Sequence, residues 1–199
     1  MNHLLSKIGS YPFEKLNLLH KDIKPSKEVI NLSIGEPKLN ADSKVLDILN
    51  KETNSFSNYP PMNAVPELSE AYRQYLESHF GIKNVAEDEV CLVAGTREGT
   101  FSIIQALFNK ENVKDKPYVV MPNPFYQIYG GATTLAGGEA KFLDCPEEDN
   151  FQPDLGSLKS EDWQKCQILV LCSPNNPTGS VLPLSKLKDI LDLADKYDF

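Results

Sequence analysis

The stretch LVLCSPNNPTGSV, residues 169–181, joins an apolar strand to an unusually long polar turn. Residues 167–172 are rich in leucine and β-branched residues, a composition typical of a strand buried in a parallel sheet. An ordinary turn needs one or two residues such as Asn, Pro or Gly, whereas residues 173–179 supply seven positions of this kind. The length of this turn indicates that an amide side chain is held rigidly at the end of the strand, where a ligand can reach it.

Strands and helices alternate along the rest of the chain. The pattern predicts strands at 29–37, 89–95, 118–121, 139–144 and 167–172, and helices at 41–53, 66–80, 98–110, 126–137 and 183–197. This alternation predicts an α/β fold with a mostly parallel sheet covered by helices. Residues 1–28, with one short amphipathic segment at 13–21, are interpreted as an N-terminal arm, and residues 29–199 as the body of a domain.

Composition and charge exclude several classes of function. The chain has 199 residues, is 41% hydrophobic and 24% charged, and carries a net charge of −8, which argues against a nucleic-acid or anionic-membrane surface. The four cysteines are widely spaced and the three histidines form no metal-like pair, so neither a disulfide framework nor a metal site is expected. Without a signal peptide or membrane-spanning stretch, a cytoplasmic location is expected.

Three strand ends carry unusual residues, and the carboxyl ends of parallel strands meet at one edge of a sheet. The first is AGTREGT, in which Gly95, Thr96 and Arg97 stand between an expected strand and a helix. Backbone N–H groups at a helix start can bind a phosphate, and Gly95 permits close approach. Taken alone, these residues are explained better by a plain turn with Thr96 as the helix N-cap.

The other two strand ends offer an aromatic face and an amide donor. In MPNPFYQIYGG, Phe125 or Tyr126 can stack on a flat ring, although both fit as core residues that open a helix. In SPNNPTG, an asparagine fixed by the following proline can donate to an anionic oxygen. Asn175 also fits as an amide that only satisfies backbone groups of the turn. A phosphate, a flat ring and a phenolate oxygen occur together in pyridoxal phosphate, which we expect as the cofactor.

The motifs resemble those of the fold-type I aminotransferases, which use pyridoxal phosphate. SPNNPTG is similar to the signature of this family, and four other motifs match it in the same order: NLSIGEP, NYPPMNAVPELSEAY, VAGTREGTF and PNPFYQIYGGA. Within the family, YPFEKL, INLSIGEPK, GTREG and MPNPFYQIY look most like the bacterial N-succinyldiaminopimelate aminotransferases of the diaminopimelate route to lysine. The resemblance implies a partial three-layer αβα large domain with an N-terminal arm, which is an incomplete pyridoxal-phosphate-binding domain over residues 29–199.

The resemblance also implies roles for individual residues. Gly95, Thr96 and Arg97 would bind the cofactor phosphate, Tyr126 would stack on the pyridine ring, and Asn176 would donate to the phenolate oxygen. Gly35 would lie against the substrate carboxylate. Tyr59 would reach the phosphate in the neighbouring subunit, which implies a homodimer. Pro124 and Pro177 would follow cis peptide bonds.

The groups that perform the chemistry in this family are expected beyond Phe199. They are the lysine that holds the cofactor, the aspartate that faces the ring nitrogen, and the arginines that bind carboxylate and phosphate. The last two residues resemble the beginning of another buried strand, so the chain is expected to be an N-terminal portion without catalytic residues, inactive alone.

The reaction implied for the whole enzyme is amino transfer between N-succinyl-LL-2,6-diaminopimelate and 2-oxoglutarate. Three alternatives stay open: another class I or II aminotransferase, a carbon–sulfur lyase, and a cofactor-binding remnant without catalysis.

Overall fold

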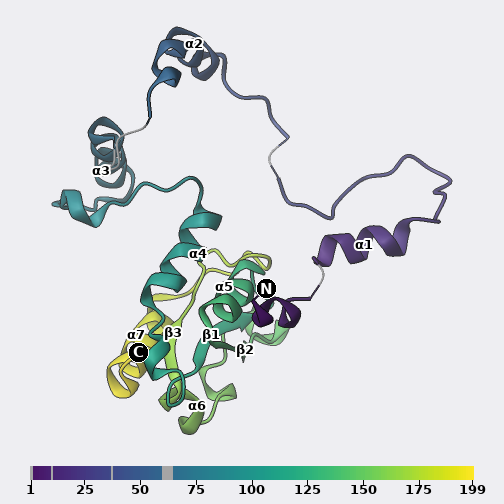
Figure 1. Cartoon of the computed structure of the whole chain (residues 1–199), viewed down its shortest axis with the longest axis vertical. Helices are drawn as coiled ribbons and strands as arrows, with labels where there is room; N and C mark the ends of the chain where they lie inside the picture. Colours follow the sequence, from purple (N-terminus) through teal and green to yellow (C-terminus); the bar gives the residue numbers. More distant parts are fainter. Residues whose placement is uncertain (1, 10, 37, 60–64) are drawn as a thin grey trace. The chain divides into compact units, whose positions relative to one another are not determined.

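The computed structural model describes residues 2–9, 11–36, 38–59 and 65–199, and these form two compact units. One unit consists of Met1–Gly9 and Val93–Phe199, and the other of Ser10–Leu92. The first unit contains the sheet formed by the described residues, drawn in teal and green in Figure 1. It therefore carries the strand ends at which the sequence places a ligand.

The sheet has three parallel strands in the order β2-β1-β3. Its central strand has a core of Val119, Val120 and Met121, each 0% exposed. The elements of this unit are α4 (Thr96–Leu107), β1 (Tyr118–Asn123), α5 (Ile128–Ala136), β2 (Glu139–Asp144), α6 (Ser160–Gln164), β3 (Cys166–Leu169) and α7 (Leu184–Tyr197). The α/β fold with parallel strands, predicted from the alternation of patterns, is confirmed.

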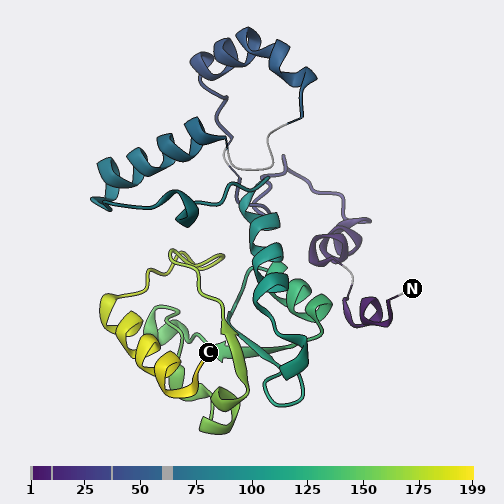
Figure 2. The same cartoon turned by 60° about the vertical axis from the view of Figure 1, so that its left-hand side comes forward.

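Helices cover both faces of this sheet. Val119 and Met121 pack against Tyr129 of α5 and against Phe108, which follows α4. Val120 points to the opposite face, because successive side chains of a strand alternate. There it packs in a second cluster with Leu143, Leu158, Trp163 and Cys166, against which Leu193, Tyr197 and Phe199 also pack. The sheet thus lies between α4 and α5 on one side and α6 and α7 on the other, the αβα layering that was expected (Figure 2).

The second unit contains α1 (Pro12–His20), α2 (Ser43–Lys51) and α3 (Pro66–Phe80). Helix α2 begins where the Asp42 carboxylate accepts from the Lys44 N–H at 2.8 Å. Helix α3 has Pro66 in its first turn and ends at Gly81, whose φ of 67° is left-handed. These capping residues explain why the helix predicted at 66–80 is found at those bounds, and why α2 is shorter than the predicted 41–53. The division into an arm of residues 1–28 and a domain of residues 29–199 stays a prediction.

Two predicted strands are wrong. The described residues of 29–37 form no strand, and residues 90–95 are irregular after a short 3-10 helix at Glu87–Glu89. Cys91, which lies in the predicted strand at 89–95, is exposed. A strand exists only when a neighbour accepts and donates its backbone hydrogen bonds, and the described residues provide no such neighbour here.

Strand β3 ends at Leu169, earlier than the predicted residue 172. The last ladder bond runs from the Val170 N–H to the Val120 carbonyl at 2.9 Å. In the register that pairs Val120 with Leu169, the next donor of β1 toward β3 is Pro122. Proline has no N–H, so the ladder cannot continue.

Candidate functional site

The polar turn after β3 is closed by its own hydrogen bonds. The Asn175 N–H donates to the Ser180 carbonyl at 2.8 Å, and the Gly179 N–H donates to the Asn175 carbonyl at 2.7 Å. The Asn175 side-chain amide donates to Thr178 Oγ1 at 3.0 Å. Gly179 has a φ of 73°, which a residue with a side chain adopts only with strain. The turn therefore has a defined shape that its sequence enforces.

The two asparagines of this turn have different environments. Asn175 is buried, 9% exposed, and its amide nitrogen is used inside the turn. Asn176 is exposed, and its side chain makes no hydrogen bond within the part of the chain that the structure describes. The Asn175 side chain thus helps to close the turn through the Thr178 hydroxyl and not through backbone groups, and Asn176 is the asparagine available to a ligand. The contact of Asn176 with a phenolate oxygen stays a prediction.

The proline geometry expected for this edge of the sheet is confirmed. The peptide bonds Asn123–Pro124 and Asn176–Pro177 are both cis. A third cis bond, Ser173–Pro174, was not predicted.

The start of α4 supplies backbone donors. Gly95 is the N-cap residue, with φ 106° and ψ 148°, and no side chain caps the helix. The N–H groups in the first turn of an α-helix have no partner within the helix. In α4 the N–H groups of Thr96 and Arg97 are among them. Gly95, Thr96 and Arg97 are all exposed. The arrangement can hold a phosphate, although the Glu98 carboxylate lies close to Gly95 and has to turn away from an anion.

An open hollow of about 480 Å³ connects this helix start with the start of α5. Its lining comes from the first two turns of α4 and the first residue of α5: Arg97, Glu98, Phe101, Ser102 and Ile128. The loop after β1 leads directly into α5. The structure therefore brings the Gly-Thr-Arg segment and the Tyr126 segment to one region.

Tyr126 is half-buried at the start of α5 and contacts Tyr129 edge-on, with ring centroids 5.7 Å apart. Burial is the main cause that raises the pKa of Tyr129 to about 12, and the neighbouring Cys172 and Tyr126 raise it further. The Tyr129 hydroxyl therefore stays protonated near neutral pH. Phe125 packs on Phe142 of β2, with ring centroids 5.1 Å apart. Both candidate aromatics thus pack against the core on this face of the sheet, and Tyr126 does so beside Tyr129.

Gly35 and Tyr59 belong to the second unit. Both are exposed, and Tyr59 is 99% exposed. Residues 60–64 of the motif NYPPMNAVPELSEAY lie outside the described residues. The roles of Gly35 and Tyr59 stay predictions.

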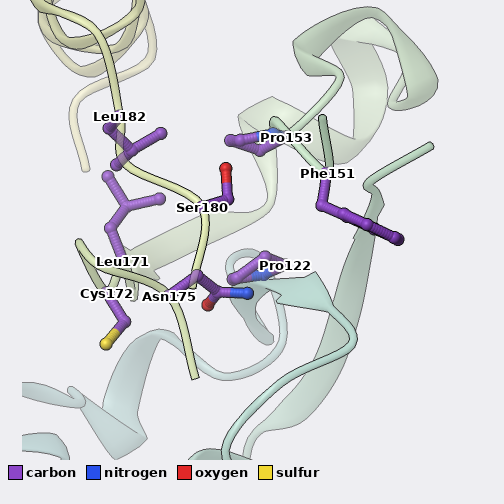
Figure 3. Close-up of a pocket in the computed structure, with 8 residues that line it drawn as sticks. All are labelled: Pro122, Phe151, Pro153, Leu171, Cys172, Asn175, Ser180 and Leu182. Atoms are coloured by element: carbon purple, nitrogen blue, oxygen red, sulfur yellow. The ribbon is translucent and has the colours of Figure 1, made fainter. Parts of the chain in front are cut away.

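Gln152 is a residue of this region that the sequence did not indicate. Its amide donates to Ser180 Oγ at 2.6 Å and to the Val181 carbonyl at 2.9 Å, which ties the loop after β2 to the end of the polar turn. Figure 3 shows Ser180 and Asn175 on that turn, facing Pro153 and Pro122. Glutamines on loops are common and unpatterned, so no sequence signal distinguished this one.

Two kinds of feature are absent from the described residues. In the ranges that the structure covers, no cluster of histidine, cysteine or carboxylate side chains is arranged to bind a metal ion. No helix in those ranges is both long and apolar enough to cross a membrane.

Comparison with known proteins identifies the family of the chain. The model of the family "Aminotransferase class I and II" matches residues 27–199. An LL-diaminopimelate aminotransferase from Natranaerobius thermophilus is 29% identical over 98% of this chain and 49% of its own length. A crystal structure of an aminotransferase from Neisseria meningitidis is 40% identical, with a TM-score of 0.90 over 100% of this chain and 51% of that one.

An aminotransferase structure from Helicobacter pylori is 34% identical, with a TM-score of 0.86 over 96% of this chain and 50% of that one. The chain thus spans about half the length of the relatives that it matches. Because the family model covers most of the sequence, the chain belongs to the class I and II aminotransferases, a family of pyridoxal-phosphate-dependent transferases.

Proposed function

We propose that this chain supplies the cofactor-holding part of an aminotransferase that acts on N-succinyl-LL-2,6-diaminopimelate and 2-oxoglutarate. The observation that supports it best is that the uncapped start of α4 and the first residue of α5, two positions after Tyr126, line one open hollow. Cys172, in the segment that leads to the turn with the exposed Asn176, neighbours Tyr129 of α5.

The residues fit pyridoxal phosphate. The free N–H groups after Gly95 suit a phosphate, because they combine hydrogen-bond donors with the positive end of the helix dipole. Tyr126 offers a half-buried aromatic face, and Asn176 an amide that the turn itself does not use. When bound, pyridoxal phosphate supplies an electron sink for proton removal from the amino acid. The chain's own residues hold its phosphate, ring and ring oxygen in place.

The substrate rests on the motifs near Tyr11, Gly35 and Tyr126 that resemble N-succinyldiaminopimelate aminotransferases. A second candidate is LL-diaminopimelate itself, because several relatives carry the name LL-diaminopimelate aminotransferase, at 28–31% identity. The two substrates differ by a succinyl group that replaces an ammonium charge with an amide and a carboxylate. We further propose that the whole enzyme is a cytoplasmic homodimer in which Tyr59 reaches the partner's cofactor.

Cofactor binding is tested on the purified 199-residue chain by titration with pyridoxal phosphate, followed by the phosphorus resonance of the ligand. We expect saturable binding that Asn176→Ala weakens about 10- to 100-fold, the range for one hydrogen bond to a charged group. Asn150→Ala, in the loop after β2, is the control and leaves the affinity unchanged. No saturable binding, or equal binding by Asn176→Ala, would contradict the cofactor assignment.

The reaction is tested separately, with both candidate amino donors and 2-oxoglutarate. We expect the 199-residue chain to bind cofactor but to release no glutamate, because it spans about half the length of its relatives and none of its motifs supplies the lysine that holds the cofactor. In the complete enzyme, we expect the succinylated donor to be preferred over LL-diaminopimelate. Turnover by the 199-residue chain, or preference for the free diamino acid, would overturn the respective part of the proposal.

A further inference from the structure

The chain separates from β1 between the end of β3 and the polar turn of residues 173–179. The backbone ladder between them ends with the bond from Val170 to Val120, because Pro122 has no N–H to donate to the Val170 carbonyl. The next potential bond, from the Cys172 N–H to the Pro122 carbonyl, is not formed. Backbone polar groups on both sides of the gap are therefore available to another partner.

A small cavity lies at this separation, with a volume of about 10 Å³ (Figure 3). This is close to the space that one ordered water molecule needs. The cavity is lined by residues from β1, the loop after β2 and the polar turn: Pro122, Phe151, Pro153, Leu171, Cys172, Asn175, Ser180 and Leu182. An organic ligand is too large for it.

Asn175, one of the residues that line the cavity, has a side-chain amide with unmet hydrogen-bonding capacity. Asn175 Oδ1 is buried and has no hydrogen-bond partner among the residues that the structure covers, although the same amide donates to Thr178. If the two ends of the amide are exchanged, the nitrogen becomes the group without a partner, so one end lacks one in either orientation. Buried polar side chains in folded proteins are almost always paired, either with protein or with an ordered water.

We propose that one ordered water molecule occupies this cavity and donates a hydrogen bond to Asn175 Oδ1. Ser180 Oγ, which also lines the cavity, and the unpaired groups of Cys172 and Pro122 provide the further partners that such a water requires. The water bridges the Cys172 N–H and the Pro122 carbonyl, which form no direct bond, and it joins β1 to the turn. Two sets of hydrogen bonds then stabilise the turn: those of the water molecule and those of the Gln152 amide.

This inference concerns the turn itself and does not depend on the proposed function. Its test is the transfer of magnetisation from water to the backbone and side-chain amides of the nitrogen-15-labelled chain, without cofactor. We expect cross-peaks from water to the Cys172 N–H and to the Asn175 amide, with the sign of a water that tumbles with the protein.

Two variants make the test specific. Asn175→Leu keeps the side-chain size but removes the acceptor, and we expect it to lose the water cross-peak at Cys172. Asn176→Leu makes the same change one residue later, where the side chain is exposed, and we expect it to keep that cross-peak. Absence of the cross-peaks in the unmodified chain overturns the proposal, whether or not the variants fold. Loss in both variants, or in neither, also overturns the assignment to Asn175.

Discussion

Gly95→Ala tests whether the start of α4 has the backbone geometry on which the phosphate site depends. Gly95 has φ 106° and ψ 148°, a combination that is essentially restricted to glycine. Forcing alanine into such a region costs about 1–3 kcal/mol. The added methyl group would come within 3.2 Å of Glu98 Oε2, but that side chain is exposed and can move away. The backbone strain therefore determines how much Gly95→Ala lowers the free energy of unfolding.

The assay is urea unfolding followed by the fluorescence of Trp163, the single tryptophan of the chain, which is 2% exposed. With a slope of about 2 kcal/mol per M, typical of small domains, we expect the midpoint to fall by about 0.5–1.5 M. Affinity for pyridoxal phosphate falls as well, because the methyl group stands beside the phosphate donors.

Gly131→Ala is the matched control. Gly131 lies inside α5, and a Cβ there meets no atom within 4 Å. Since alanine is the better helix former by about 1 kcal/mol, we expect a midpoint equal to or above that of the unmodified chain. If Gly95→Ala matches the unmodified chain in both midpoint and cofactor affinity, the proposed geometry of the helix start is wrong. A fall in Gly131→Ala as large as that in Gly95→Ala would show that the loss is not specific to the glycine-only conformation.

Three further perturbations address the fold around the site. In Gly138→Ala the new Cβ would lie 2.8 Å from the buried Phe108 ring, so we expect a loss of about 1–3 kcal/mol in urea unfolding, and an unchanged midpoint would contradict the packing. Leu143→Ala removes a side chain that is 0% exposed and is expected to lower the free energy of unfolding by about 2–5 kcal/mol; a loss below 1 kcal/mol would mean that the cavity collapses. The hydrogen bond between Lys141 and Asp162, 2.7 Å long, lowers the pKa of Asp162 and raises that of Lys141. Asp162→Asn is expected to lower the free energy of unfolding by about 0.5–1 kcal/mol, because both side chains of the pair are partly exposed. We expect this difference to be constant from about pH 5 to 9. It is lost as pH falls through the pKa of the folded carboxyl and as pH rises through that of the folded ammonium, and a difference independent of pH would exclude the pair.

Much of the layered fold is predictable from local patterns. The strand at Glu139–Asp144 and the helix at Pro66–Phe80 have the predicted bounds. For the helix, a proline at the start and a glycine just past the end specify both boundaries locally. The polar turn is likewise marked by its residues, since the cis bond before Pro177 and the left-handed Gly179 are conformations that only a few residue types adopt readily.

What the sequence by itself determined is therefore the class of fold, the order of its elements and the motifs of the family. The tertiary structure decided which apolar segments pair: residues 90–95 form no strand without a neighbour, and β3 ends at Leu169 because the next donor of β1 would be Pro122. It also decided that Asn175 is buried while Asn176 is exposed, and that Gln152 supports the turn. The physical reason is that backbone pairing and burial depend on partners distant in the chain, whereas caps and turns depend on their own residues.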